Sequence, residues 1–327
     1  MKNISIIGSG SWGVALGIHM AKLGHNIKIW SFLKEEADLI NNERKCKFLP
    51  EIELPNNIIA TQSFKECING SDYIFHVTPS QVVRNTVKQY KEYVNGQPII
   101  ICSKGFEKDT LYTLNEIVEE ELPNNKVAVF SGPSHAEEVS REVPTAMVLA
   151  SKDKKLLEDL HSMLSNENMR IYLSTDVKGV ELGGSLKNII AFCAGMLISL
   201  NLGDNSFAAL LTRGLTEISR LGVALGGNHE TFYGLSGLGD LIVTCSSKFS
   251  RNRRAGMLIG QGKSLDETKK EVGMTIESVE NIDVAYKLGQ MHNIDMPIVN
   301  TAYDILYNRL DVKEALKQLM TRDKKSE

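Results

Sequence analysis

Cysteine is scarce and scattered in this chain. The five cysteines are odd in number and no two have CxxC spacing, which argues against a disulfide framework and against a zinc site: Cys46, Cys67, Cys102, Cys193 and Cys245. The seven histidines form no HxxxH pair and no Cys/His cluster along the sequence, so we expect no metal site. A reducing, cytoplasmic compartment is the location that this cysteine usage predicts.

A strong charge of one sign is also absent. The 37 lysines and arginines nearly balance the 40 aspartates and glutamates, and the formal net charge is −3. A globally basic surface would favour nucleic acid or an anionic membrane, so we expect no nucleic acid partner. Small neutral or anionic ligands are compatible with this balance.

Long hydrophobic runs are missing as well. The most apolar stretch, residues 181–204 (ELGGSLKNIIAFCAGMLISLNLGD), is interrupted by polar residues and Lys187. It falls short of the roughly 18 consecutive apolar residues of a membrane span, and it predicts a buried helix instead. The N-terminal apolar run is too short for a signal peptide and lacks a cleavage region. We therefore expect no membrane insertion.

Short β-branched runs do occur, and they alternate with amphipathic stretches, which predicts βαβ units and a parallel sheet. We expect strands at 4–7, 26–30, 57–61, 72–77, 98–102, 126–130 and 145–150, with helical spacing at 12–23, 81–94 and 109–121. From about residue 177 the periodicity is helical, at 178–200, 206–225, 251–260, 265–271, 277–290 and 299–307. This pattern predicts an N-terminal Rossmann-type doubly wound α/β domain (residues 1–176) and an all-helical C-terminal substrate-binding domain (residues 177–327).

A glycine motif follows the first expected strand. Gly8, Gly10 and Gly13 have GxGxxG spacing at the start of a helix, and a second strand begins about 20 residues later. Glycines there allow a tight turn and a close approach of a pyrophosphate to the helix N-terminus. A glycine-rich turn without a ligand is the alternative, and the strand–turn–helix context favours dinucleotide binding.

The end of the second strand lacks the acidic residue that would bind the ribose 2′-hydroxyl of NAD. Ser31, Phe32 and Leu33 stand there instead. Ser31 or Lys34 could receive a 2′-phosphate, although Lys34 also fits an ordinary solvated helix start. NAD and NADP both remain open as cofactors.

Polar residues follow two later strands, where ligands of open α/β sheets bind. With Lys187 and the glycines beside them, they are predicted to line one cleft for an anionic substrate: Lys104, Gly105, Ser131, Gly132, Ser134 and His135. Asp240 is expected in a glycine-rich loop, GLSGLGDLIVTC. The segment FSRNRRAG holds Arg251, Arg253 and Arg254, whose guanidinium groups suit a phosphate, and a solvated helix face is an equal alternative.

Eight segments together resemble the bacterial NAD(P)-dependent glycerol-3-phosphate dehydrogenases. They run in the family's order over nearly the whole chain: IGSGSWGVAL, SKGFE, SGPSHAEEV, GVELGGSLKNIIAFCAGM, ALLTRGLTEISRLG, GLSGLGDLIVTC, SRNRRAGMLIGQG and MPIV. The resemblance implies reversible hydride transfer between NAD(P)H and dihydroxyacetone phosphate, giving sn-glycerol 3-phosphate for phospholipid synthesis. It also implies a small phosphorylated substrate and is compatible with a homodimer.

The resemblance assigns roles to individual residues. Lys187 would be the catalytic group, accepting a proton in oxidation and donating one in reduction. The substrate would contact Lys104, Gly132, Ser134, Lys187, Asp240, Ser250, Arg251 and Asn252. Beside the glycines of the motif, the cofactor would contact Ser11, Trp12, Phe32, Lys104, Ala136, Arg251, Thr275 and Glu277.

The chemistry of Lys187 agrees with that role. Reduction of a ketone forms an oxyanion, which needs a proton donor within hydrogen-bond reach. Burial favours the neutral form of an amine, while a nearby Asp240 would favour the charged form and hold the amine in place. We therefore expect Lys187 to exchange protons near neutral pH.

Three positions depart from the family pattern: Phe207 replaces a common basic residue, Thr275 lies in an altered segment (MTIESVEN), and Leu33 replaces a basic residue of some relatives. Two other functions stay open at this point. One is a related 3-hydroxyacid or ketopantoate-type reductase with the same two-domain architecture. The other is a non-catalytic dinucleotide sensor, which would have no reason to bury Lys187.

Overall fold

The computed structural model describes residues 1–323, and its contacts divide the chain into two compact units. The first unit comprises Met1–Lys104 and Tyr112–Glu181, and the second comprises Gly105–Leu111 and the chain from Leu182 onward. The division falls inside one long helix, slightly after the predicted boundary between residues 176 and 177. Residues 324–327 of the predicted second domain lie outside the described residues.

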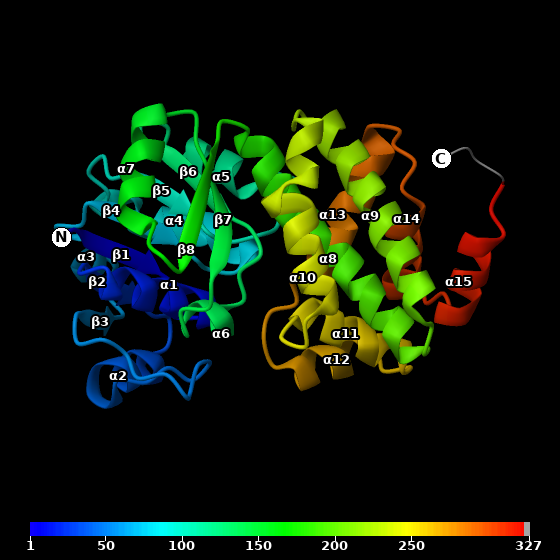
Figure 1. The fold of residues 1–327 in the computed structure, drawn as a ribbon, viewed down its shortest axis with the longest axis horizontal. Coiled ribbons are helices and arrows are strands. Elements are labelled where there is room, and N and C mark those ends of the chain that lie inside the picture. Colours follow the sequence, from blue (N-terminus) through cyan, green and yellow to red (C-terminus); the bar gives the residue numbers. More distant parts are fainter. Residues whose placement is uncertain (324–327) are drawn as a thin grey trace. The chain divides into compact units, whose positions relative to one another are not determined.

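The first unit is built on one eight-stranded sheet with the strand order β3-β2-β1-β4-β5-β6-β7-β8 (Figure 1). The strands are β1 (Asn3–Ile7), β2 (Asn26–Trp30), β3 (Ile58–Thr61), β4 (Tyr73–His76), β5 (Ile99–Ile101), β6 (Val127–Ser131), β7 (Thr145–Ala150) and β8 (Met169–Ser174). The order of the first six strands is that of a dinucleotide-binding Rossmann sheet. All seven predicted strands are present, and the Rossmann-type fold class is confirmed.

The expectation of a purely parallel sheet is wrong at one pair, because β6 and β7 run antiparallel. Their connection contains only the four-residue helix α6 (Ala136–Val139), whereas a parallel crossover normally uses a full helix. The sequence interpretation also missed β8. That edge strand buries Met169 and Ile171 and exposes Arg170 and Tyr172. Because polar and apolar residues alternate in it, a search for continuous apolar runs does not find it.

Helices cover both faces of this sheet. They are α1 (Ser11–Lys22), α2 (Lys34–Glu43), α3 (Phe64–Ile68), α4 (Val83–Tyr90), α5 (Leu114–Glu121), α6 and α7 (Lys154–Leu164). Helix α1 packs against β1, β2 and β3, while α4 contacts both α3 and α5. Helix α5 begins later than predicted because Thr113 and Glu116 form a capping box that sets its start.

No strand occurs among the described residues of the second unit. Its helices are α8 (Val177–Ser199, whose first residues belong to the first unit), α9 (Asp204–Ala224), α10 (Asp240–Ser246), α11 (Arg251–Gly260), α12 (Leu265–Val272), α13 (Glu277–Met291), α14 (Pro297–Tyr307) and α15 (Val312–Met320). Helix α8 is long and apolar enough to cross a membrane, but 83% of its most apolar window is buried inside the structure. This agrees with the predicted buried helix. Phe207, on α9, packs against the core of this unit.

The predicted loop around Asp240 is wrong, because Asp240 is the first residue of α10 and a π-helical turn, Leu235–Gly239, precedes it. Leu241 and Cys245, four residues apart, are both completely buried. The glycines that precede Asp240 have low helix propensity, which argues against a helix here. The helix forms because burial of its apolar face stabilises it.

Candidate active site

The glycine-rich loop of the first unit has the geometry of a phosphate cradle. Gly8 has a φ of +126°, and a Cβ there would lie 2.9 Å from the Val77 carbonyl oxygen. A Cβ at Gly13 would lie 2.1 Å from the Gly8 carbonyl oxygen, so only glycine fits either position. A Cβ at Gly10, the N-cap of α1, would meet nothing within 4 Å. The first N–H groups of α1 thus adjoin open space beside a tight turn, which fits the pyrophosphate of a dinucleotide.

The other predicted cofactor residues of this unit lie at the carboxyl ends of strands or at helix starts. Ser11 and Trp12 form the first turn of α1, and Ala136 is the first residue of α6. Phe32 follows β2 and is 75% exposed, so its ring is available to stack on an adenine. These positions are compatible with a bound NAD or NADP.

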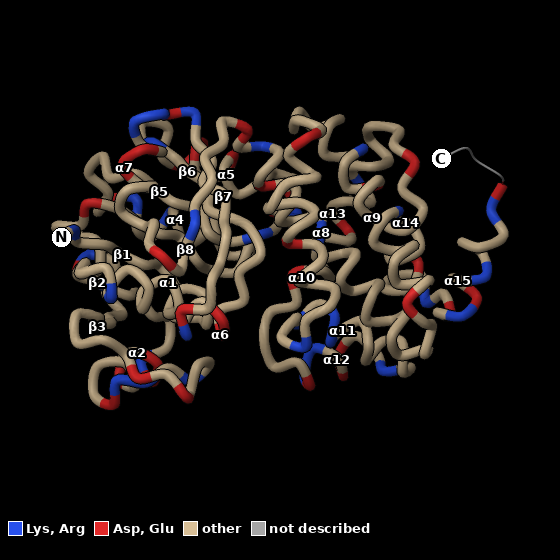
Figure 2. Tube along the Cα trace, in the orientation of Figure 1, with Lys and Arg blue, Asp and Glu red and all other residues tan. Residues whose placement is uncertain are grey.

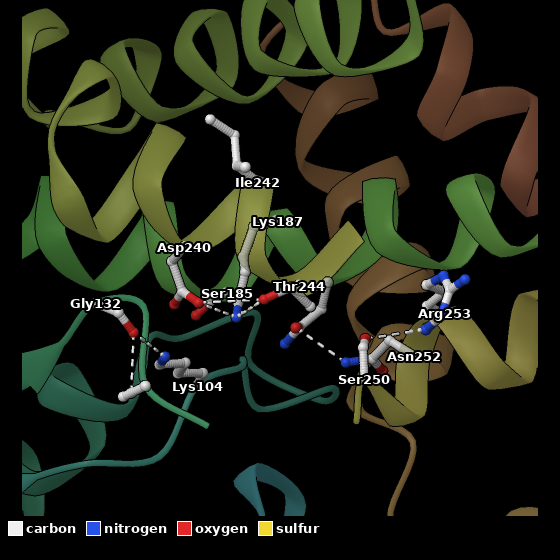
Figure 3. A network of polar contacts seen from close by, with 12 residues as sticks. Lys104, Gly132, Ser185, Lys187, Asp240, Ile242, Thr244, Ser250, Asn252 and Arg253 are labelled. Carbon is white, nitrogen blue, oxygen red and sulfur yellow. Dashed lines mark hydrogen bonds and ion pairs between the residues drawn. The ribbon is translucent and has the colours of Figure 1, made fainter. Parts of the chain in front are cut away.

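Three predicted substrate residues lie together after β5 and β6, two of which, Lys104 and Gly132, are labelled in Figure 3. The ammonium group of Lys104 donates to the Gly132 carbonyl oxygen at 3.0 Å, and the Ser134 hydroxyl donates to the same oxygen at 3.0 Å. The structure therefore brings Lys104, Gly132 and Ser134 together within the first unit.

Lys187, on α8, is buried and held by α10 in the second unit. Lys187 is only 6% exposed and Asp240 only 1%. The Lys187 ammonium donates to Asp240 Oδ1 at 2.5 Å and to Thr244 Oγ1 at 2.6 Å, and the Thr244 hydroxyl donates to Asp240 Oδ1 at 3.2 Å (Figure 3). The carboxylate compensates the cost of burying the ammonium group.

A cysteine near this pair is chemically inert. Burial raises the pKa of the Cys245 thiol to about 12, although the charge of Lys187 opposes that shift. Cys245 is therefore a neutral thiol at physiological pH.

The start of α11 gathers donors for an anion. Ser250 caps the helix by accepting from Arg253 N at 3.2 Å. The Asn252 amide donates to Asn188 Oδ1 at 3.0 Å, which ties this helix start to α8 beside Lys187. Arg251 is exposed and donates to the Thr275 carbonyl oxygen at 3.2 Å. A helix N-terminus flanked by a guanidinium group is suited to a phosphate.

The basic segment around α11 divides into two parts. Figure 2 shows lysines and arginines gathered at α11 and α12. Arg253 donates to the Ser247 carbonyl oxygen and Arg254 donates to the Glu271 carbonyl oxygen. All three arginines thus donate to neighbouring backbone, and Arg251 differs in lying at the first position of the helix.

The last predicted cofactor residues, Thr275 and Glu277, lie at the start of α13. Thr275 is exposed, and its carbonyl accepts from Arg251. Glu277 is the first residue of α13, and the next backbone N–H, of Ser278, donates to Asn252 Oδ1 at 3.0 Å. Both residues therefore neighbour the start of α11.

Sequence reasoning missed Thr244 and Asn188. Thr244 lies four residues after Asp240, a spacing that puts both on one face of a helix, but the segment was interpreted as a loop. Asn188 follows Lys187 directly in the sequence, and only its contact with Asn252 in the structure identifies it as part of the site. Among residues 1–323, no group of three or more His, Cys, Asp or Glu side chains could hold a metal ion.

A Rossmann-type unit with a phosphate cradle, joined in one chain to a helical unit with a buried Lys–Asp pair, is the architecture of a two-domain dinucleotide-dependent dehydrogenase. Family models agree. The NAD-dependent glycerol-3-phosphate dehydrogenase N-terminus matches residues 3–157, and the C-terminus of the same family matches residues 176–317. The chain belongs to the NAD-dependent glycerol-3-phosphate dehydrogenase family.

Individual relatives support the same conclusion. The glycerol-3-phosphate dehydrogenase [NAD(P)+] of Fusobacterium nucleatum is 48% identical over 332 residues, covering 100% of this chain and 99% of the relative. The crystal structure of glycerol-3-phosphate dehydrogenase from Coxiella burnetii has a TM-score of 0.95 at 37% identity, over 98% of this chain and 99% of that one. A 2-dehydropantoate 2-reductase from Methylococcus capsulatus shares the fold alone, with a TM-score of 0.60 at 13% identity over 98% of both chains.

Proposed function

We propose that this chain interconverts dihydroxyacetone phosphate and sn-glycerol 3-phosphate with Lys187 as the proton-transfer group. The family and the NAD(P) cofactor follow from the similarities above, and the role of each residue is our proposal. The observation that carries it is the placement of Lys187. A buried ammonium group held at 2.5 Å by a carboxylate and at 2.6 Å by a hydroxyl is the kind of buried, partnered titratable group that clusters at functional sites.

In the reductive direction, bound NAD(P)H supplies the hydride that adds to the ketone carbon. The carbonyl oxygen gains negative charge, and the Lys187 ammonium donates one proton to it, leaving a neutral amine and a secondary alcohol. In the oxidative direction the neutral amine accepts the proton of the hydroxyl group.

Asp240 and Thr244 position the amine. A lysine side chain has four flexible methylene groups, and two fixed contacts at its end restrict the ammonium to one place. This restriction lowers the entropy that must be lost when the proton is transferred. We assign Asp240 to the substrate site as well, as the carboxylate that completes this arrangement.

Ser250, Arg251 and Asn252 are the proposed phosphate site. The phosphate does not react, so its binding energy can be used to place the ketone against Lys187. The helix start and the Arg251 guanidinium together supply N–H donors and positive charge. Lys104, Gly132 and Ser134 are proposed as the contacts that the first unit makes with the same substrate.

The cofactor site is proposed to comprise the phosphate cradle and the residues around it: Gly8, Gly10, Ser11, Trp12, Gly13, Phe32, Lys104, Ala136, Arg251, Thr275 and Glu277. In this scheme residues 1–176 form the dinucleotide-binding domain and residues 177–327 form the substrate-binding domain, and each domain adds a few contacts to the other's ligand. We further propose a cytoplasmic location, supported by five cysteines that are all free and buried. We also propose that the protein forms a homodimer and that it supplies glycerol 3-phosphate for phospholipid synthesis.

One assay tests this function. Purified protein is mixed with dihydroxyacetone phosphate and NADH or NADPH, and loss of reduced nicotinamide is followed by absorbance. We expect turnover with dihydroxyacetone phosphate and none with 2-dehydropantoate. Cofactor binding without turnover on either substrate would instead support a non-catalytic dinucleotide sensor.

A further inference from the structure

A carboxylate reaches the phosphate cradle from an unexpected element. The end of β2 carries no acidic residue, but Glu36, in the first turn of α2, turns back toward β1 and β2. The Ser9 hydroxyl donates to Glu36 Oε2 at 2.5 Å, and the Ser31 hydroxyl lies 3.4 Å from the same oxygen. The two serine hydroxyls are 2.8 Å apart. Three polar side chains, from the loop after β1, the residue after β2 and the first turn of α2, thus form one cluster.

This cluster lies where a Rossmann domain distinguishes its cofactors. Ser9 stands between Gly8 and Gly10 of the cradle, and Ser31 directly follows β2. In such domains a side chain at the end of the second strand contacts the ribose 2′ position, as an acid for a hydroxyl group or as an arginine for a phosphate. Glu36 therefore brings negative charge to the place where the missing acidic residue would stand.

The surroundings do not neutralise this charge. Within residues 1–323, no lysine or arginine forms an ion pair with Glu36. The residue preceding α2 is Leu33, which is apolar and partly exposed. The Ser31 hydroxyl donates to the Leu33 carbonyl oxygen at 2.9 Å, with Glu36 Oε2 as its second acceptor at 3.4 Å, so its proton lies between these two oxygens and is not presented to a phosphate. Lys34 is the nearest basic residue in sequence, and it is exposed at the first position of α2.

We propose that Glu36 makes this chain select NAD(H) over NADP(H). The carboxylate accepts a hydrogen bond from the ribose 2′-hydroxyl of NAD(H), and it repels the 2′-phosphate of NADP(H), which carries close to two negative charges at neutral pH. Ser9 and Ser31 hold the carboxylate in place. This inference rests on the proposed binding of a dinucleotide by the first unit and adds which of the two cofactors binds.

Binding measurements test the preference without any turnover. Dissociation constants of NADH and NADPH are obtained from nicotinamide fluorescence, and 2′-AMP and 5′-AMP are compared as competitors. We expect NADPH to bind at least ~30-fold more weakly than NADH, which corresponds to about 2 kcal/mol. Glu36→Gln keeps an acceptor for Ser9 and removes the charge, so it should bring the ratio below ~5, mainly through tighter NADPH binding.

Glu35→Gln is the matched control, because Glu35 is an exposed acid in the same helical turn. It should leave the NADH to NADPH ratio within about twofold of wild type, since solvent and salt screen an exposed charge. Thermal unfolding of each variant verifies that it is folded. Equal affinity of the wild type for both cofactors overturns the inference. An equal loss of affinity for NADH and NADPH in Glu36→Gln overturns it as well. Absence of binding by either cofactor would instead contradict the proposed dinucleotide site itself.

Discussion

The Asp240 carboxylate and the Lys187 ammonium are 2.5 Å apart although 53 residues separate them in the sequence. Neither charge would be stable alone at this depth, because an isolated buried ion is far more costly than a paired one. The pair is also the centre of the proposed reaction, so removal of one partner affects both catalysis and folding, and thermal unfolding of each variant has to be measured beside its turnover.

Lys187→Met removes the proton donor and retains most of the side-chain volume. Because general acid catalysis typically contributes about 10²–10⁴ in rate, we expect kcat with dihydroxyacetone phosphate to fall by roughly 10³. The dissociation constant of NADH should change less than about threefold. A comparable loss of cofactor affinity and turnover would argue against a proton-transfer role.

Thr244→Val tests the positioning of the amine. Valine has nearly the shape of threonine and lacks the hydroxyl, so Lys187 keeps Asp240 and loses its second contact. Loss of one such contact should lower kcat by roughly 10- to 100-fold, about 1–3 kcal/mol, with little change in KM. Thr244→Ser restores the hydroxyl and should recover most of the rate. If valine and serine variants were equally slow, side-chain packing would explain the effect better.

Arg251→Ala should affect the phosphate more than the ketone. We expect kcat/KM for dihydroxyacetone phosphate to fall by about 10²-fold or more, because a charged contact to the phosphate is lost. Residual activity on unphosphorylated dihydroxyacetone should change little. Arg254→Ala, which removes a contact with the Glu271 carbonyl, is the control and should retain most activity on both substrates. Equal fractional losses on the two substrates in Arg251→Ala would refute the assignment.

Glu217 predicts a pH dependence of stability. This buried residue on α9 accepts hydrogen bonds from Ile298 N and Val299 N at the start of α14. Burial raises the pKa of its carboxyl to about 7 from an ordinary value near 4.5, although these hydrogen bonds oppose the shift. The folded protein therefore holds a proton that the unfolded chain has released, so the free energy of unfolding falls as pH rises from about 4.5 to about 7.

Glu217→Gln removes this proton uptake while keeping an acceptor for the helix start. Chemical denaturation at pH 5 and pH 8 should show that the variant gains up to about 3 kcal/mol relative to wild type at the higher pH. Near pH 4 the two proteins should differ little. Parallel stability curves for the two proteins across this pH range would contradict the raised pKa.

Much of the first unit was predictable because its signals are local. Alternation of β-branched runs with amphipathic stretches located seven strands, and the spacing of Gly8, Gly10 and Gly13 located the cradle. The edge strand β8 was missed because Arg170 and Tyr172 face outward and interrupt its apolar residues. Strand β7 was predicted, but its antiparallel direction was not, because the direction of pairing depends on the connection between the strands. Asp240 was placed in a loop because glycines precede it, whereas buried Leu241 and Cys245 stabilise a helix.

The sequence alone determined most of the strands and helices, the dinucleotide motif and the family, since periodicity, turns and motifs depend on neighbouring residues. Only the tertiary structure decided that Thr244 joins Asp240 at Lys187, that Arg251, Arg253 and Arg254 each donate to a backbone carbonyl, and that Glu36 turns toward Ser9. These contacts join separate elements, and they depend on how whole helices and strands pack, which no local pattern encodes.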